Sequence, residues 1–340
     1  MKYSIFSVMD HYPSRPRSVP DYYAQLFRTT EAAERLGYDT AFVAEHHFHE
    51  YGSVPNPAVM LAALATGTRR IRLGSAIATM TYHNPLIVAE SYAMVDILSG
   101  GRLVLGTGSG YLKHEFAGFG IAPEDKRQLF DETLMLVRRL LAGERVSHRG
   151  KFHTLDDVAL NVRPIQLPTP PIYVAALARE VSYFIGKQGS NLMAVPYATA
   201  GTFAEVGTLQ SEFRRGRAEG GHTAGDDDSI YAFHCYIADT DEEARSHAAA
   251  PFDLYVETRL YAQRQTYDDV IASGLALFGS VETVARKVTE LSRMGIPHIA
   301  LLMDFGFMPE ERVLRSMRAF AEEVMPRVRA ALGTEALPRG

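Results

Sequence analysis

The chain has 340 residues, of which 46% are hydrophobic and 22% charged, with a formal net charge of −5 at pH 7. This is the composition of an ordinary soluble globular protein, and the negative balance argues against nucleic acid as the main partner. The single cysteine, Cys235, excludes an intrachain disulfide framework and a cysteine-rich zinc site. No apolar run approaches the length of a membrane span, and the lone cysteine fits a reducing cytosol, so we expect a cytoplasmic protein.

Strand-like and helix-like segments alternate along almost the whole chain. Short apolar runs predict eight strands, at residues 3–9, 40–44, 71–78, 102–107, 171–175, 191–195, 229–238 and 297–303. Amphipathic segments predict helices at residues 22–36, 57–67, 85–98, 126–141, 176–187, 203–219, 241–265, 281–294 and 309–332. Eight βα units favour one TIM-like (β/α)8 barrel over residues 1–340, with a doubly wound sheet as the rival because strand order cannot be read from the sequence.

Two stretches interrupt the βα rhythm. Within residues 143–170, the segment 146–154 has the pattern of a hairpin that turns at Arg149-Gly150. Residues 262–280 hold Gly274 and few strong signals, and we expect a flap over the site there, with an ordinary ordered loop as the alternative. The predicted barrel therefore carries insertions after strands four and seven.

The second predicted strand ends in a group of ionisable side chains. Glu45, His46, His47 and His49 follow it directly, where α/β enzymes place their chemistry. One interpretation is a catalytic or cofactor-binding histidine, since histidine titrates near neutrality. The spacing His47-x-His49 also suits a metal, but no convincing further ligand ends a later strand, so no metal site is predicted. A third interpretation is a set of solvated loop residues.

Two other strand ends carry possible ligand-binding loops. Glycines at 106, 108 and 110 allow close approach of a ligand to the backbone, although tight turns explain them equally well. The segment from Ala175 to Arg179 opens a helix, whose first amide groups can bind a phosphate. Residues at or just beyond strand ends are candidates for an apolar substrate pocket, or for plain core: Phe6, Met9, Tyr12, Met80, Tyr82, Tyr197 and Phe307.

Motifs in a fixed order along nearly the whole chain carry a family resemblance. They are Ala33-Glu34-Arg35-Leu36-Gly37-Tyr38, Glu45-His46-His47-Phe48, Asn84-Pro85 with Ala89-Glu90, Asp96 to Arg102, Gly106-x-Gly108-x-Gly110 through Glu115 to Phe119-Gly120, Pro170 to Ala176, and Gly295-Ile296. In these residues the chain resembles the bacterial luciferase-like, flavin-dependent monooxygenases.

The resemblance implies a TIM-like barrel that uses reduced FMN and O2 to form a C4a-peroxyflavin. That species oxidises a small apolar carbonyl compound or a biosynthetic intermediate. It also implies a separate flavin reductase and a homodimer formed through the helices at 57–67 and 85–98. The alternatives are an F420-dependent hydride-transfer oxidoreductase of the same superfamily, a non-catalytic flavin-binding relative and, last, a barrel metallohydrolase.

Residue by residue, His46 matches the family's catalytic histidine, and Glu45 and His47 match its neighbours beside the flavin. The matched cofactor-binding positions are Ala76, Ile77, Glu90, Ser109, Tyr111, Leu112, Ala176, Leu177, Ala178 and Val181. Ser109 stands where the luciferase α chain has an arginine, so a charge partner for the phosphate is missing there. Lys113, His114 and Arg179 are the candidates to replace it.

Overall fold

Eight parallel strands close into a barrel in the computed structural model, which describes residues 1–225, 227–259 and 265–333. The barrel strands are β1 (Lys2–Ser7), β2 (Thr40–Val43), β3 (Arg72–Thr79), β4 (Leu103–Gly108), β7 (Ile172–Ala176), β8 (Asn191–Ala194), β9 (Ser229–Ala238) and β11 (His298–Asp304). Each pairs with the next, and β9 closes the ring by pairing with both β8 and β11. The TIM-like barrel is thus confirmed, and the doubly wound sheet is excluded.

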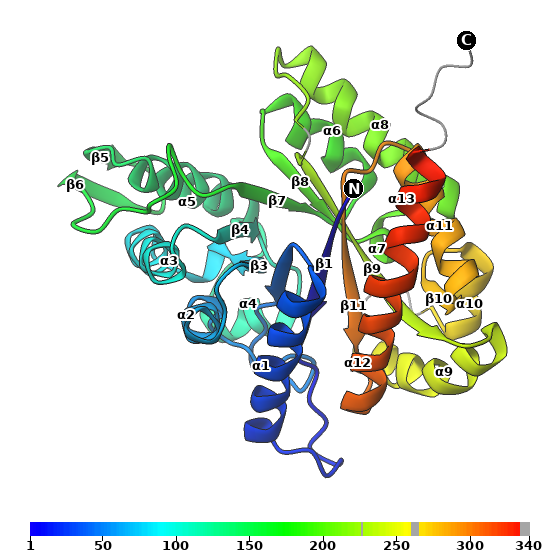
Figure 1. Cartoon of the computed structure of the whole chain (residues 1–340). Coiled ribbons are helices and arrows are strands. Elements are labelled where there is room, and N and C mark those ends of the chain that lie inside the picture. Colours follow the sequence, from blue (N-terminus) through cyan, green and yellow to red (C-terminus); the bar gives the residue numbers. More distant parts are fainter. Residues whose placement is uncertain (226, 260–264, 334–340) are drawn as a thin grey trace.

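Helices surround this barrel (Figure 1). The longer ones are α1 (Val19–Leu36), α2 (Pro57–Gly67), α3 (Pro85–Ser99), α5 (Lys126–Leu141), α6 (Arg179–Lys187), α8 (Phe203–Glu219), α9 (Asp241–Thr258), α11 (Val281–Arg293), α12 (Glu310–Ala319) and α13 (Met325–Gly333). Shorter pieces are the 3₁₀ turn η1 (Met80–Tyr82), α4 (Lys113–Phe119), α7 (Pro196–Thr199), α10 (Tyr267–Ser273) and the π-helical turn η2 (Phe320–Val324). Within the described ranges, no helix is long and apolar enough to cross a membrane.

Local sequence explains where these elements begin and end. Helix α1 begins after Ser18, whose side chain accepts a hydrogen bond from the amide of Asp21, and it ends at Gly37 with φ +82°. Helix α3 begins the same way after Asn84 and ends at Gly100 with φ +70°. Strands β2 and β4 are buried along their whole length, as parallel strands covered on both faces must be.

The region predicted as a flap contains regular structure. Residues 262–264 lie outside the described residues, and the rest holds α10 and a ninth strand, β10 (Leu277–Ser280). Strand β10 pairs with the last four residues of β9, and Tyr267 stacks on Phe278 with ring centroids 5.2 Å apart. This strand was missed because Gly279 and Ser280, half of its length, are residue types typical of turns. Motion of the segment stays a prediction.

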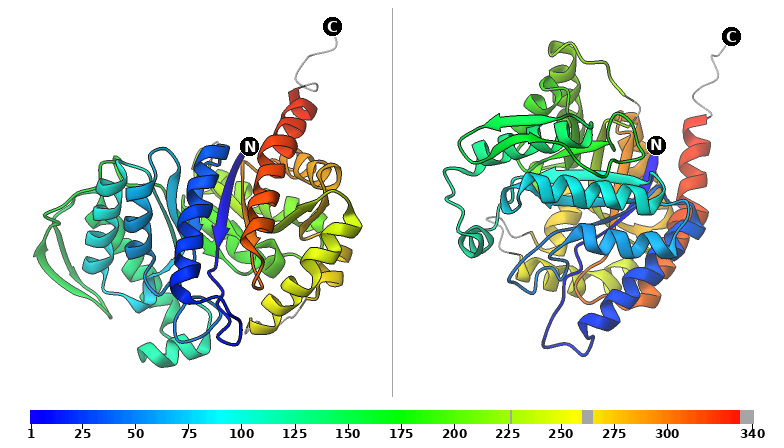
Figure 2. Two further views of the ribbon diagram at one scale, coloured as in Figure 1. Left: turned by 60° about the horizontal axis from the view of Figure 1, so that its bottom comes forward. Right: turned by 90° about the vertical axis from the view of Figure 1, so that its left-hand side faces the viewer.

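The segment between α5 and β7 forms a hairpin. Strands β5 (Val146–Arg149) and β6 (Thr154–Val158) pair antiparallel around the turn after Arg149. Figure 2 shows the hairpin at the edge of the molecule, outside the ring of barrel strands. It therefore adds surface to the barrel without contributing a barrel strand.

A partly buried polar network lies at the amino end of the barrel. His298 Nε2 lies 2.6 Å from Ser4 Oγ, and His298 Nδ1 lies 2.9 Å from a carboxylate oxygen of Asp227, which also accepts from Lys2. This serine, histidine and aspartate line up as in a hydrolase triad. They lie at the stability face of the barrel, opposite the strand ends that carry chemistry, so the network is structural.

Candidate active site

A cavity of about 640 Å³ opens among the carboxyl ends of the barrel strands. Its walls come from the residues that end β2, β3, β4 and β7, from α5 and α6, and from Arg259. Apolar side chains that reach it from inside the barrel include Phe6, Val8, Phe42, Met193, Ile230 and Leu302. This volume is typical of a site for a cofactor or a small molecule.

His46 lies on the cavity wall and is oriented by Glu115. The chain leaves β2 at Val43 and turns back, so that His46 Nδ1 lies 3.2 Å from Glu115 Oε1. The same oxygen accepts from the amide of His47 at 2.9 Å, and Glu115 Oε2 accepts from the hydroxyl of Tyr82 at 3.1 Å. A carboxylate can only accept hydrogen bonds, so the proton of a neutral His46 ring sits on Nδ1.

The surroundings of His46 and Glu115 determine which of the two side chains is charged. Burial lowers the pKa of His46, and the charge of Arg259 acts in the same direction, although the hydrogen bond with Glu115 opposes both. Burial alone would raise the pKa of Glu115, but its hydrogen bonds hold that pKa below the usual value. A neutral imidazole with its lone pair on Nε2 therefore stands beside an ionised carboxylate, which is the arrangement of a general base.

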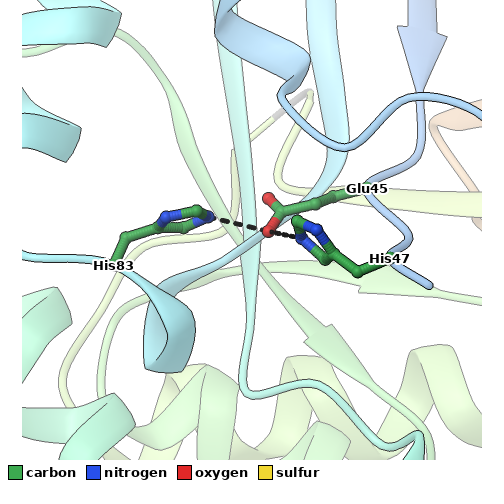
Figure 3. Close-up of side chains that lie close together, drawn as sticks. All are labelled: Glu45, His47 and His83. Atoms are coloured by element: carbon green, nitrogen blue, oxygen red, sulfur yellow. Dashed lines mark hydrogen bonds and ion pairs between the residues drawn. The ribbon is translucent and has the colours of Figure 1, made fainter. Parts of the chain in front are cut away.

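Glu45 is held by two other histidines, His47 and His83. Figure 3 shows the rings of His47 and His83 converging on one carboxylate oxygen of Glu45, at 3.0 and 2.8 Å. The other oxygen accepts from the amide of Thr79 at 3.0 Å. Burial works to raise the pKa of Glu45, yet these hydrogen bonds lower it overall. The potential metal-ligand atoms of these three side chains lie within 4.8 Å of one another, so the set could hold a divalent ion.

A bulge in β3 brings Ala76 and Ile77 into the cavity. The pairing of β3 with β4 shifts register between Ser75 and Ala78, and the two residues between them line the wall. Gly108 lies against this bulge, because an added Cβ there would come 2.2 Å from Ile77 Cδ1. The bulge presents a small apolar surface suited to a planar ring.

Close packing of two strands explains why residue 106 is a glycine. An added Cβ would come 2.2 Å from the backbone oxygen of Ser75 on β3. Part of the glycine motif is therefore required by the close packing of two strands, while Gly108 and Gly110 line the cavity.

One side of the cavity has the features of an anion site. Ala176, Leu177, Ala178 and Val181 line it at the start of α6, where no side chain caps the first turn. Lys126, Arg127 and Arg138 of α5 line the same cavity, but Arg138 lies about three turns beyond Lys126 and donates to Ser190 Oγ, past the far end of α6. Burial lowers the pKa of both Lys126 and Arg138. Helix amides and cations together suit a phosphate.

Most of the predicted site residues face this cavity. The lining includes Glu45, His46, Ala76, Ile77, Ser109, Tyr111, Ala176, Leu177, Ala178 and Val181. Three predicted residues lie outside it: His47 supports Glu45 from behind, Leu112 is buried at the start of α4, and Glu90 is half-buried on α3.

The three residues predicted as possible charge partners of the phosphate do not line the cavity. Neither Lys113 nor Arg179 lines the cavity, and His114 is turned to the backbone oxygen of His47, 3.0 Å away. Lys126 and Arg127 of α5 are cations that do line the cavity. These cations belong to a strongly amphipathic helix. The amphipathic pattern predicted the helix, but it did not predict that the polar edge of the helix would reach the cavity.

For most of the residues named as candidates for an apolar pocket or for plain core, the second interpretation holds: Met9, Tyr12, Met80 and Tyr197 are buried core residues. Of the seven side chains named, only Phe6 lines the cavity. Tyr12, for example, is buried and donates a hydrogen bond to Asp10 at 2.6 Å. Glu115, Tyr51 and Arg259 were not among the predicted site residues, because they lie in loops or helices with no catalytic spacing to mark them.

The fold and this cavity define a barrel protein with a ligand site at the carboxyl ends of its strands. The family model described as luciferase-like monooxygenase matches residues 1–298, and the chain belongs to this family.

Three relatives illustrate the range of the family. The crystal structure of monooxygenase RslO1 from Streptomyces bottropensis matches with a TM-score of 0.89 and 32% identity, covering 96% of this chain and 99% of that one. The oxygenase component of a flavin-dependent trigonelline monooxygenase from Acinetobacter baylyi is 25% identical over 96% of this chain and 95% of its own. An F420-dependent glucose-6-phosphate dehydrogenase from Amycolatopsis mediterranei is 27% identical over 88% of this chain and 92% of its own.

Proposed function

We propose that the protein is the oxygenase of a two-component, FMN-dependent monooxygenase that oxidises a small, mainly apolar carbonyl compound. The observation that carries this proposal is the neutral His46, oriented by Glu115, on the wall of a cavity large enough for a flavin. The family and the named monooxygenases among the relatives support it.

The residues present fit FMN. The bulge at Ala76 and Ile77 offers an apolar wall for the ring system, and Gly108 leaves it room. The first amides of α6, with a cation from the start of α5 such as Lys126, would hold the phosphate. When bound, reduced FMN supplies the electrons with which O2 is activated for transfer of one oxygen atom.

The protein's own part is orientation and proton transfer. Glu115 keeps the proton of His46 on Nδ1, so that Nε2 can accept a proton from the reacting groups and return it later. Glu45, fixed by His47 and His83, places a permanent negative charge beside the same wall. The apolar lining keeps water away from the reaction.

Supply of reduced flavin by a separate reductase is consistent with the exposed phosphate side of the site. Leu177 and Ala178 are exposed, so a reduced flavin can enter and leave there. The relative from A. baylyi is itself named an oxygenase component, and such a component is supplied with reduced flavin by another protein.

A homodimer is proposed through α2 and α3. Large apolar side chains stand exposed on these helices: Val59, Ile87, Met94, Ile97 and Leu98. Helices α2 and α3 pack against each other, and exposed apolar side chains on neighbouring helices can be buried in a twofold contact.

The test has two arms. Reduced FMN is titrated into the protein without oxygen, and binding is expected, with weaker binding in Lys126→Met. The protein is then given a reductase, ¹⁸O₂ and a panel of cyclic ketones and aldehydes, and mass spectrometry should find one labelled oxygen atom in a product. His46→Gln should lower product formation about 100-fold or more.

The alternatives give different results. Hydride transfer to or from F420 that does not require oxygen would replace the proposal with the F420-dependent activity. Flavin binding with no product across the panel, and no difference between wild type and His46→Gln in the rate of oxidation of bound reduced FMN, would favour a non-catalytic relative.

A further inference from the structure

Three side chains from two strand ends bring their nitrogen and oxygen atoms to one place. Glu45 and His47 follow β2, and His83 follows the short turn η1 after β3. Both imidazoles point Nε2 at the same carboxylate oxygen, as Figure 3 shows, at 3.0 and 2.8 Å. The potential ligand atoms of all three lie within 4.8 Å of one another. A single ion can therefore contact the whole set.

The spacing of these atoms is close to that of a metal site. Zn²⁺ binds imidazole nitrogen and carboxylate oxygen at about 2.0–2.2 Å, so neighbouring ligands in a tetrahedral site lie about 3.3 Å apart. The contacts of His47 and His83 with Glu45 Oε1 differ from this value by about 0.5 Å or less. Small movements of the side chains would make room for an ion.

The surrounding structure fixes two of the three side chains. The other oxygen of Glu45 accepts a hydrogen bond from the amide of Thr79 at 3.0 Å. The ring of His47 lies edge-on to the rings of Phe119 and Tyr82, with centroids 4.7 and 5.7 Å apart. Hydrogen bonds to a ligating side chain orient it and raise its affinity for a metal. The set is therefore preorganised.

The cluster is reached from the side of His83. The side chains of Glu45 and His47 are 1% and 8% exposed, whereas that of His83 is 29% exposed. Glu45 also lines the ligand cavity, but neither histidine of the cluster does. An ion therefore enters past His83 rather than through the cavity, and water from that side can complete its coordination.

The donor set selects the kind of ion. Two imidazoles and one carboxylate suit first-row transition ions such as Zn²⁺, whereas Mg²⁺ and Ca²⁺ prefer oxygen ligands. Without an ion, the carboxylate only accepts hydrogen bonds, so a neutral ring carries its proton on Nε2. When an ion binds, each ring gives it the Nε2 lone pair and carries the proton on Nδ1 instead. The hydrogen bonds satisfy the cluster without an ion, so the protein does not need one to fold.

We propose that Glu45, His47 and His83 form a binding site for a divalent transition-metal ion of the Zn²⁺ type beside the ligand cavity. The bound ion offsets the negative charge of Glu45 at the cavity wall. The sequence did not predict this site, because His83 does not directly follow a strand. The site does not depend on the flavin chemistry proposed above, so the two proposals are tested separately.

The probe is Zn²⁺ itself. Untagged protein, freed of metal with a chelator and dialysed, is titrated with Zn²⁺ against a chromophoric chelator in the absence of flavin. One ion per chain is expected to bind more tightly than all others, and Ca²⁺ should not displace it. Crystals soaked in Zn²⁺ should show an anomalous difference peak among the three side chains.

Variants locate the tight ion. His83→Gln should weaken its binding about 100-fold or more, since loss of an outer-shell partner alone costs about 10–100-fold. Glu45→Gln should do the same, and His83→Gln carries the test if that buried substitution prevents folding, as judged by circular dichroism. His49→Gln is the matched control, because His49 is turned to the amide of Tyr51, 3.2 Å away, and takes no part in the cluster. It should bind Zn²⁺ as the wild type does.

Three results would overturn the proposal. They are a wild type that binds Zn²⁺ no more tightly than His83→Gln, loss of the tight ion in His49→Gln rather than in His83→Gln, and an anomalous peak away from Glu45. Reduced FMN is titrated into the same proteins without Zn²⁺. Normal binding of reduced FMN alongside any of these results would leave the proposed function standing.

Discussion

Replacing His234 by phenylalanine should change how the stability of the barrel depends on pH. His234 lies on β9 inside the molecule, 1% exposed, in a cluster of aromatic rings. Its Nε2 has no hydrogen-bond partner among the residues that the structure describes. Burial lowers the pKa of this imidazole from its ordinary value of 6.5 to about 3.

The sign and size of the effect follow from these two values. The unfolded chain takes up a proton at His234 near pH 6.5, whereas the folded chain resists it, so the free energy of unfolding is reduced as the pH falls from 6.5 toward 3. Integrated between pH 7 and pH 5, this one group removes about 2 kcal/mol of stability. His234→Phe should not show this loss.

The assay is urea unfolding of both proteins at pH 7, 6 and 5. The difference in the free energy of unfolding between variant and wild type should shift by about 2 kcal/mol in favour of the variant across this range. Phe252→Leu, in the same cluster with ring centroids 5.0 Å from His234, is the control, since it removes packing but no titrating group. Equal slopes for His234→Phe and the wild type would show that His234 is not buried as a neutral group.

Other substitutions test the remaining parts of the account. Glu115→Gln should move the proton of His46 from Nδ1 to Nε2 in part of the molecules, which ¹⁵N-detected histidine NMR measures; an unchanged tautomer would contradict the role given to the carboxylate. Gly106→Ala should cost about 2 kcal/mol or more in the free energy of unfolding, because its methyl group would meet a backbone oxygen of β3, and a loss below about 0.5 kcal/mol would mean that the strands are less tightly packed. Met94→Glu should convert the dimer to a monomer in light scattering, and a monomeric wild type would refute the dimer. His298→Ala should lower stability by about 2 kcal/mol while reduced FMN binds as before, since its partners lie at the amino end of the barrel.

The barrel could be predicted because its signals are local. Buried strands and amphipathic helices alternate in the sequence, and caps such as Ser18 and Gly37 mark helix ends. The missed elements have weak local signals: β10 contains the turn-type residues Gly279 and Ser280, and α4 is only seven residues long. Strand β10 forms only because β9 continues beyond the barrel and offers an edge for pairing.

Site residues that directly follow a barrel strand could be predicted from the sequence. Site residues that reach the cavity only through tertiary packing could not. Glu45 and His46 stand directly after β2, so their place at the cavity follows from the fold class. Glu115 and Arg259 reach the same cavity from a short helix and from the end of α9, and no spacing in the sequence links them to His46.

A crystal soaked with reduced FMN under dithionite shows whether the cavity is the flavin site. We expect density for the ring system between the wall formed by Ala76 and Ile77 and the side chain of His46, with the phosphate at the first turn of α6. Density for the ring outside this cavity, or a cavity that stays empty at saturating reduced FMN, would contradict it.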